Sequence, residues 1–272
     1  MNLFRRVRAT LLLLTVIGGA CTGDSAATPS SGRGGRGRQS ADGLIERTTI
    51  PYRENVTTSS AGGSVVGSVS IDGDLPADSI TTATADESIC GASFPNASVV
   101  HTDRALGNVV VWLADVQQGK PLPAERRTEL LNERCQLVPH VQGVVVGTTV
   151  NVRSDDRLPH TTQLLRSGTA DTLARIPLTD DGQVVPNENL ATKPGMIEAR
   201  CVQHPWTRGY IAVFAHPYFA VTDPGGTFRL DSVPPGRYQL IAWHERGADH
   251  IERQVEVKEG EATQVEIKVK LR

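Results

Sequence analysis

Short runs of alternating apolar and polar residues dominate the chain from Gly63 onward. The runs VNVR, TFRL and QVEIKVKL alternate with a period of two, which is typical of strands that bury one face. Other runs, including NVVVWLADV and GYIAVFAH, are rich in β-branched residues and are bounded by turn residues. The pattern predicts an all-β architecture of one or two sandwiches.

One segment departs from the strand pattern, and two runs of turn residues separate strands near the end of the chain. Residues 123–135, PAERRTELLNERC, have helical composition and spacing, and we expect a helix there. The runs DPGG at 223–226 and PPGR at 234–237 place Pro and Gly where tight turns need a fixed or positive φ. Both turns divide the last part of the chain into strands.

The C-terminal run AVTDPGGTFRLDSVPPGRYQLIAWHE resembles the carboxypeptidase regulatory-like domain, also described as transthyretin-like or carbohydrate-binding-like. The resemblance implies a β-sandwich over residues 216–272. Because this segment is short for such a domain, we expect residues 63–115 to supply its first strands, with the middle of the chain inserted between them. Consecutive, separate modules are the alternative.

The N-terminus has the pattern of an export signal. Residues 1–21 combine a basic start, the apolar run ATLLLLTVIGGA and a cysteine, which predicts a lipoprotein signal peptide with a lipid on Cys21. Gly18 stands where a lipobox usually has Leu, so ordinary secretion is the alternative. Residues 22–62 are rich in Ser, Gly, Thr and Arg and predict a disordered linker. We expect a protein of the cell envelope, periplasm-facing or at the surface, anchored to the membrane through Cys21.

Composition limits the partners. The net charge is -2, so the arginines of the linker are not supported as a nucleic-acid surface, and no nucleic-acid partner is expected. An exported chain can keep disulfides. Cys90 and Cys135 lie beside loop-like stretches and can pair, closing a loop of about 45 residues. The other two pairings among the three remaining cysteines stay open, and with the first pairing Cys201 is left over.

Two stretches resemble the cupredoxin family, in its plastocyanin/amicyanin-like branch. Residues 143–165, GVVVGTTVNVRSDDRLPHTTQLL, resemble the part that leads to the first copper-binding histidine. Residues 193–214, KPGMIEARCVQHPWTRGYIAVF, resemble the strand, ligand loop and final strand of the second half. The resemblance implies a cupredoxin-like Greek-key sandwich over about 116–215, with His160, Cys201 and His204 as copper ligands.

The chemistry of copper explains this choice of residues. A soft thiolate and two imidazoles suit copper in both oxidation states, so electron transfer needs little rearrangement. One ligand comes early in the sequence and two share a short loop, so a rigid β-scaffold can hold all three before the metal enters.

The axial position of the loop departs from the family pattern. Thr207 stands where the amicyanin-like loop has methionine, and Met196 lies on the wrong side of Cys201 to replace it. An axial ligand is long and weak and can be glutamine or a backbone oxygen. The candidates are the carbonyl of Pro159, the side chain of Gln203, or no ligand, while Trp206 can shield the metal edge.

Other interpretations of the Cys201 and His204 pair compete with copper. The sandwich could have kept its shape and lost the metal. Zinc would want four ligands, with His140 as the fourth. A Cys–His nucleophile would need a third group that orients the imidazole beside a substrate cleft. We expect a non-enzyme.

The remaining polar candidates have simpler interpretations. His216 and His244 are expected to be hydrogen-bonded structural groups, and Trp112 and Trp243 core or interface anchors. The carboxylate pairs at 155–156 and 180–181 lack the spaced ligand series of a calcium loop and are expected to be solvated turns.

These observations together predict a copper-binding envelope protein that transfers single electrons to or from an unidentified redox partner. The competing hypothesis is a non-catalytic carbohydrate-binding or structural module with a vestigial metal site. A strip of exposed aromatic residues on the C-terminal sandwich would favour a glycan ligand.

Overall fold

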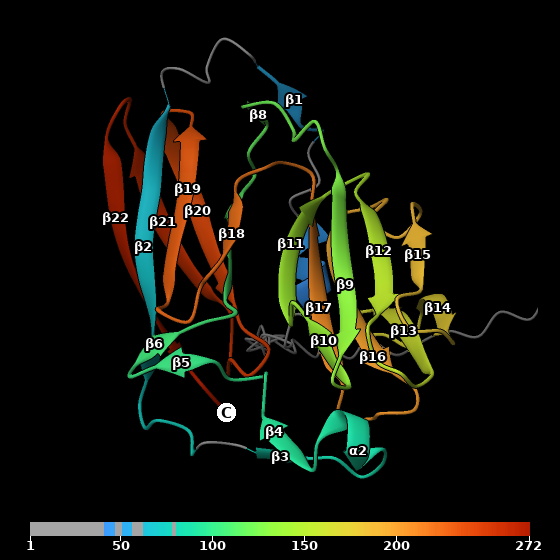
Figure 1. The fold of residues 1–272 in the computed structure, drawn as a ribbon. Coiled ribbons are helices and arrows are strands. Elements are labelled where there is room, and N and C mark those ends of the chain that lie inside the picture. The colour runs from blue at the N-terminus through green and yellow to red at the C-terminus, as the bar shows by residue number, and fades with distance from the viewer. Residues whose placement is uncertain (1–40, 47–50, 56–61, 78–79) are drawn as a thin grey trace, which may run out of the picture. The chain divides into compact units, whose positions relative to one another are not determined.

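The computed structural model describes residues 41–46, 51–55, 62–77 and 80–272, and these residues are almost entirely β-structure (Figure 1). The all-β prediction is therefore confirmed. Glu and Lys occupy exposed positions of β22 (Ala262–Lys270), whose burial alternates along its length. No helix among these residues is long and apolar enough to cross a membrane.

The first sandwich combines strands from both ends of the described chain. β2 (Gly63–Asp72) pairs in parallel with β22 and antiparallel with β19 (Thr227–Val233), and cyan β2 lies beside red β22 in Figure 1. β7 (Val110–Ala114) pairs with β20 (Gly236–Trp243). The other strands of its two sheets are β5 (His101–Thr102), β6 (Ala105–Leu106), β18 (Phe219–Val221) and β21 (Ile251–Val257).

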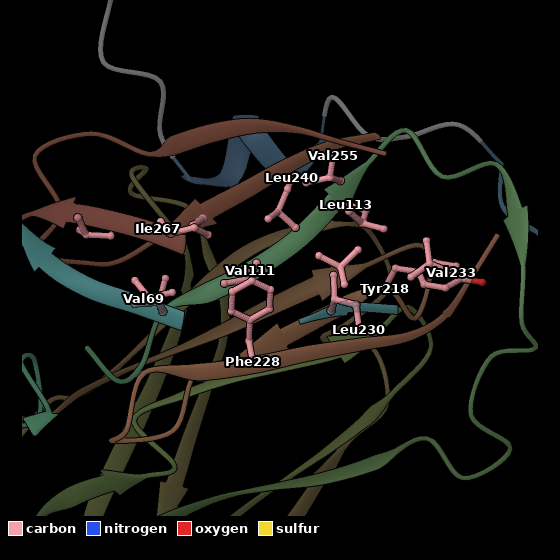
Figure 2. Close-up of a cluster of buried hydrophobic side chains, with 14 of the residues drawn as sticks. Val69, Val111, Leu113, Tyr218, Phe228, Leu230, Val233, Leu240, Val255 and Ile267 are labelled. Atoms are coloured by element: carbon pink, nitrogen blue, oxygen red, sulfur yellow. The ribbon is translucent and has the colours of Figure 1, made fainter. Parts of the chain in front are cut away.

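The core of this sandwich lies between its two sheets. Val69, Phe228 and Ile267 from one sheet pack against Val111 and Leu240 from the other (Figure 2). Each apolar side chain of this size contributes roughly 1.5–3 kcal/mol when it leaves water. The alternation seen in the sequence thus supplies one buried face for each strand.

The second sandwich consists of the middle of the chain. Leu130, Val150 and Val152 of one sheet pack on Leu164, Ile211 and other apolar residues of the second sheet. The first sheet contains β9 (Arg127–Glu133), β10 (Gln136–Val138), β12 (Thr149–Ser154) and β15 (Val184–Asn187). The second contains β11 (Val141–Val145), β13 (His160–Arg166), β14 (Thr172–Leu178), β16 (Gly195–Cys201) and β17 (Arg208–Phe214).

Two strands are apolar at nearly every position because both of their faces are buried. In β7, Val111 and Leu113 face the core of the first sandwich, whereas Trp112 joins a third apolar cluster. In β17, Ile211 faces the second core and Phe214 joins the same third cluster. This shared cluster holds one sheet of each sandwich against the other.

The helix expected over residues 123–135 is wrong. Residues Arg127–Glu133 form β9, in which Leu130 and Asn132 are buried and their neighbours are more exposed. The strand pairs with β12 and β10, so backbone hydrogen bonds and a half-buried face outweigh a helical propensity of a few tenths of a kcal/mol per residue. Arg134 and Cys135 both have positive φ, which makes the tight hairpin turn to β10.

Part of the predicted linker is also ordered, so the prediction of disorder over 22–62 is wrong for residues 41–46 and 53–54. Residues Ala41–Glu46 form α1, and Leu44 and Ile45 are buried in the shared cluster. Asp42 accepts the Met196 N–H at 2.9 Å and an Arg166 N–H at 3.1 Å. Two buried apolar residues and the bonds of Asp42 therefore anchor this segment to the rest of the fold.

The remaining elements are short. α2 (Glu87–Cys90) lies between β3 (Ile80–Thr82) and β4 (Ser93–Pro95), which pair with each other. β1 (Arg53–Glu54) pairs with β8 (Gln118–Gly119). The segment 80–95 that contains α2 is linked to the second sandwich by a disulfide between Cys90 and Cys135.

Candidate metal centre

Three side chains meet at one end of the second sandwich. His160 begins β13 and Cys201 ends β16, and the two antiparallel strands are neighbours, with Thr162 opposite Cys201. The start of one antiparallel strand lies at the same edge as the end of its partner. His204 follows three residues later, in the loop to β17, so the register of one sheet brings all three together.

The donor atoms of these residues form a compact triangle. The Nδ1 atoms of His160 and His204 each lie 3.4 Å from Cys201 Sγ and 3.2 Å from each other. All three side chains are buried, and His204 is fully inaccessible to solvent. Two nitrogen lone pairs and a sulfur therefore converge on one point away from water.

The triangle fits a metal ion of the transition series. A triangle with these sides has its centre about 1.9 Å from each corner, close to the roughly 2.0–2.3 Å of metal–nitrogen and metal–sulfur bonds. Two imidazoles and one thiolate in a trigonal arrangement are the donor set typical of blue-copper sites. The residues present fit copper.

A buried carboxylate orients the first histidine. His160 donates from Nε2 to Asp156 Oδ2 at 2.9 Å, which leaves Nδ1 free to face the metal position. Asp156 also accepts the backbone N–H groups of Arg134 at 2.6 Å and Cys135 at 2.9 Å. Asp156 was expected to be a solvated turn residue, and that prediction is wrong because the β9–β10 turn covers it.

A second carboxylate contacts the other histidine. His204 Nε2 lies 3.2 Å from Asp86 Oδ2, and Asp86 immediately precedes α2. The Asp86 side chain is about half exposed, in contrast to Asp156. Asp86, four residues before the end of α2, reaches the metal site in a segment that the Cys90–Cys135 disulfide links to the second sandwich.

The three ligand candidates perturb one another electrostatically. Burial raises the pKa of the Cys201 thiol, but hydrogen bonds from His160 and His204 outweigh it and lower that pKa to about 5. Burial lowers the pKa of His160, but its bonds to Asp156 and Cys201 outweigh this and raise the pKa to about 9. The cysteine and the histidines therefore favour each other's charged forms.

The residues proposed for the axial position have other contacts. Gln203 Oε1 accepts the Thr161 N–H at 2.7 Å and lies 3.6 Å from Cys201 Sγ. The Thr207 hydroxyl donates to the Cys135 carbonyl. Pro159 directly precedes His160, and the axial ligand stays a prediction. Met196 is buried in the shared cluster between the sandwiches.

Trp206 and the disulfide complete the surroundings of His204. The Trp206 and His204 rings are tilted, with centroids 5.2 Å apart, and Trp206 packs against the cluster containing Cys90 and Cys135. The disulfide sulfurs and a His204 nitrogen lie within 4.8 Å of one another. Because both cysteines are oxidised, they supply no thiolate to a metal.

The other histidines lie away from the triangle. His140 pairs with Glu245, so it does not complete a zinc site with the three ligand candidates. His216 and His244 are buried, and burial lowers the pKa of each to about 4. Their Nε2 atoms have no hydrogen-bond partner among the described residues.

Other predicted site residues have ordinary environments or lie elsewhere. Asp155 is exposed and forms an ion pair with Arg153, and Asp180 and Asp181 are exposed in a turn. Cys21, the predicted lipid attachment site, lies outside the described residues. The sequence contained one signal for the role of Asp156: it lies four residues before His160.

A comparison with protein families matches a short part of the chain. The profile described as "Polysaccharide lyase family 4, domain II" matches residues 209–265. This profile differs from the carboxypeptidase regulatory-like domain that the sequence resembles. No curated protein sequence matches the chain.

Solved structures similar to the chain include copper proteins. A purple cupredoxin from Nitrosopumilus maritimus is 22% identical, with 32% of this chain and 98% of that chain covered and a TM-score of 0.28. A reduced amicyanin variant is 19% identical, with 34% and 85% covered and a TM-score of 0.28. A copper-containing nitrite reductase from Thermus scotoductus SA-01 is 23% identical, with 36% of this chain covered and a TM-score of 0.29.

These similarities are limited to about a third of the chain, and the match to the nitrite reductase spans 23% of that enzyme. The identities and scores do not establish a shared function. The assignment of a metal centre therefore depends on the donor atoms of this chain.

Proposed function

We propose that this protein binds one copper ion through His160, Cys201 and His204 and transfers single electrons without turning over a substrate. The observation that carries the proposal is the buried triangle of two Nδ1 atoms and one Sγ atom with sides of 3.2–3.4 Å. Bound copper would supply the one-electron couple, and a thiolate with two imidazoles suits copper in both oxidation states.

The donor set favours copper over structural zinc. Structural zinc sites are closed by four protein ligands, whereas three ligand atoms converge here among the described residues. A thiolate suits a soft ion, and two neutral imidazoles keep the charge of the site low. Asp156 and Asp86 hold the outer nitrogens of the two histidines, so both rings are oriented before a metal arrives.

The buried position of the triangle suits electron transfer. A metal held by β13, β16 and the ligand loop sits in a rigid sheet, so little reorganisation accompanies a change of oxidation state. Burial of all three donor residues also limits the access of a substrate to the metal position. Both features support a carrier rather than an enzyme.

Copper titration of the purified, metal-free protein tests the proposal. We expect one equivalent of copper(II) to produce an intense visible band from thiolate-to-copper charge transfer. Cys201→Ser should abolish the band, and His160→Gln should weaken or abolish it. His250→Gln is the matched control, because His250 pairs with Glu252 outside the triangle and its loss should leave the band unchanged. A colourless native protein with a titratable thiol would refute the copper proposal.

We also propose that the protein works at the cell envelope, held to the membrane by a lipid on Cys21, with a redox protein as its partner. The support is the sequence pattern of residues 1–21. Membrane fractionation with mass analysis of the N-terminal peptide tests it. Cys21→Ser should move the protein from the membrane to the soluble fraction, and an unmodified Cys21 in membrane-bound protein would contradict the anchor.

The alternative of a glycan-binding module has one observation in its favour, the polysaccharide lyase domain profile over residues 209–265. Among the described residues, however, no Trp, Tyr or Phe is exposed. Sugar sites on β-sandwiches need aromatic faces for stacking. A pull-down on immobilised acidic and neutral polysaccharides distinguishes the two functions, and retention of metal-free protein would favour the glycan role.

A further inference from the structure

A cavity of about 320 Å³ opens beside the ligand loop, lined in part by Trp206, Thr207 and Arg208. Four segments line it: part of 81–98, part of 136–140, residues 206–208 and residues 245–246. His160 and Cys201 are not among the lining residues. Trp206 is, so the cavity is separate from the metal position but adjoins it through one ring.

The cavity combines aromatic walls with guanidinium groups. Phe94, Leu137 and Trp206 supply apolar surface, and Arg208 and Arg246 supply positive charge. Its volume lies at the lower end of the roughly 300–1,000 Å³ typical of small-molecule sites. It therefore suits a molecule of one aromatic ring and is too small for an oligosaccharide.

The positive charge of the lining is not fully compensated. Glu198 forms two hydrogen bonds with Arg200, at 2.6 and 2.8 Å, and is also 3.4 Å from Arg208, so one carboxylate serves two arginines. Glu245, the carboxylate in the lining, is paired with His140. The lining thus holds two guanidinium groups and one carboxylate, and that carboxylate bonds to His140 rather than to either arginine.

Arg246 has no Asp or Glu partner within the described part of the chain. It donates to a main-chain oxygen of Arg272 at 2.9 Å and, over a longer 3.5 Å, to the Ser98 hydroxyl. A guanidinium group has five N–H donors in a planar fork, and it binds carboxylates in a bidentate manner. Arg246 therefore retains donors for an anionic ligand.

Unpartnered polar atoms also gather around this cavity. Trp206 Nε1 and His140 Nδ1 are buried side-chain atoms without a hydrogen-bond partner among the described residues, and both residues line the cavity. Buried polar groups in folded proteins are nearly always paired. An indole N–H can only donate, so its natural partner is an acceptor oxygen.

We propose that this cavity binds a small aromatic anion, a one-ring carboxylate of the benzoate class. The ring would lie among Phe94, Leu137 and Trp206, and the carboxylate would face Arg246 and Arg208. This binding goes beyond the proposed copper function and does not require the metal. The Trp206 ring contacts the His204 ring, so an occupied cavity is coupled to the metal centre through two adjacent rings.

Calorimetric titration of the metal-free, purified protein with benzoate tests the proposal. We expect saturable binding with one site, while benzyl alcohol and benzylamine, which keep the ring but lack the negative charge, bind at least tenfold more weakly. Equal affinity for benzoate and benzyl alcohol would overturn the anion assignment. Absence of benzoate binding at about 1 mM would overturn the site itself.

Variants locate the binding. Arg246→Gln should weaken benzoate binding about tenfold, the usual effect of losing one hydrogen-bonded charge, and Arg246→Lys should restore part of it. Arg253→Gln is the matched control, because Arg253 is exposed on β21 and does not line the cavity. Equal weakening by both glutamine variants would refute the location. Trp206→Phe, which keeps a ring, serves as a second probe and should reduce affinity without loss of the fold.

A copper-loaded arm separates this proposal from the copper function. If copper binds, benzoate should shift the visible band of the native protein and leave that of Arg246→Gln unchanged at the same concentration. If copper does not bind, the calorimetric result on metal-free protein still decides the cavity. A native band unmoved by saturating benzoate would refute the coupling through Trp206.

Discussion

Replacing Asp156 by Asn tests how the scaffold orients the first proposed copper ligand. Asp156 Oδ1 accepts the Arg134 N–H, and Oδ2 accepts both the Cys135 N–H and the Nε2–H of His160. An asparagine has one carbonyl oxygen and one donor group. Its oxygen can replace Oδ2 and keep two of the bonds, but the amide group then faces the Arg134 N–H.

The structure sets the magnitude of this change. A lost hydrogen bond to a buried charged group costs about 1.5–3 kcal/mol, so we expect Asp156→Asn to lower the free energy of unfolding by about 2 kcal/mol. Asp156→Ala removes all three bonds and should cost about 3–5 kcal/mol. Loss of an outer partner of a metal-binding histidine typically weakens metal binding 10–100-fold, and we expect that range for copper.

The assay has two parts and a neighbouring control. Urea unfolding of the metal-free variants measures stability, and copper competition against a chelator measures affinity. Asp155→Asn is the control, because Asp155 is exposed and bonds to Arg153 rather than to His160. The reasoning fails if Asp156→Asn and Asp155→Asn behave alike in both assays, or if copper affinity changes by less than about twofold.

Three further predictions concern stability. Replacing Cys90 and Cys135 together by Ser should lower the free energy of unfolding by about 4 kcal/mol, because their disulfide closes a loop with a sequence separation of 45 residues, and denaturant unfolding with and without reductant measures this. His216 has a folded pKa of about 4 against 6.5 when exposed, so its stabilising contribution is complete above pH 6.5 and declines as the pH falls towards 4. His216→Gln should remove up to about 3 kcal/mol of that pH dependence in unfolding curves, and an unchanged slope would contradict the burial argument. Leu44→Ala should cost about 2–5 kcal/mol in thermal or urea unfolding, whereas Leu173→Ala, with a side chain 38% exposed, should cost little, and equal effects would argue against the packing of α1.

The disulfide and the two carboxylates connect the proposed copper site to distant parts of the sequence. Cys135 donates its backbone N–H to Asp156 and accepts from Thr207 at its carbonyl. Its sulfur is bonded to Cys90, four residues after Asp86. The β9–β10 turn is therefore in contact with the surroundings of both histidines, which makes its geometry part of the site.

The sequence by itself determined the class of fold and the types of ligand residue. Alternating runs such as TFRL become strands because each has one apolar face to bury, and this requires no knowledge of the partner strand. Cys201 and His204 lie three residues apart in one loop, so their proximity is local. His160 was identified through a resemblance of motif, and the register of β13 with β16 is what brings it to the same edge.

Only the tertiary structure decided which polar residues support the site. Asp155 and Asp156 are adjacent and chemically identical, yet one is exposed and the other is buried under a turn that begins more than twenty residues earlier. Likewise, residues 127–133 form a strand because neighbouring strands complete their hydrogen bonds. The environment of a carboxylate and the partner of a backbone N–H depend on segments far apart in sequence. Local composition contains no information about which distant segment packs against a given residue.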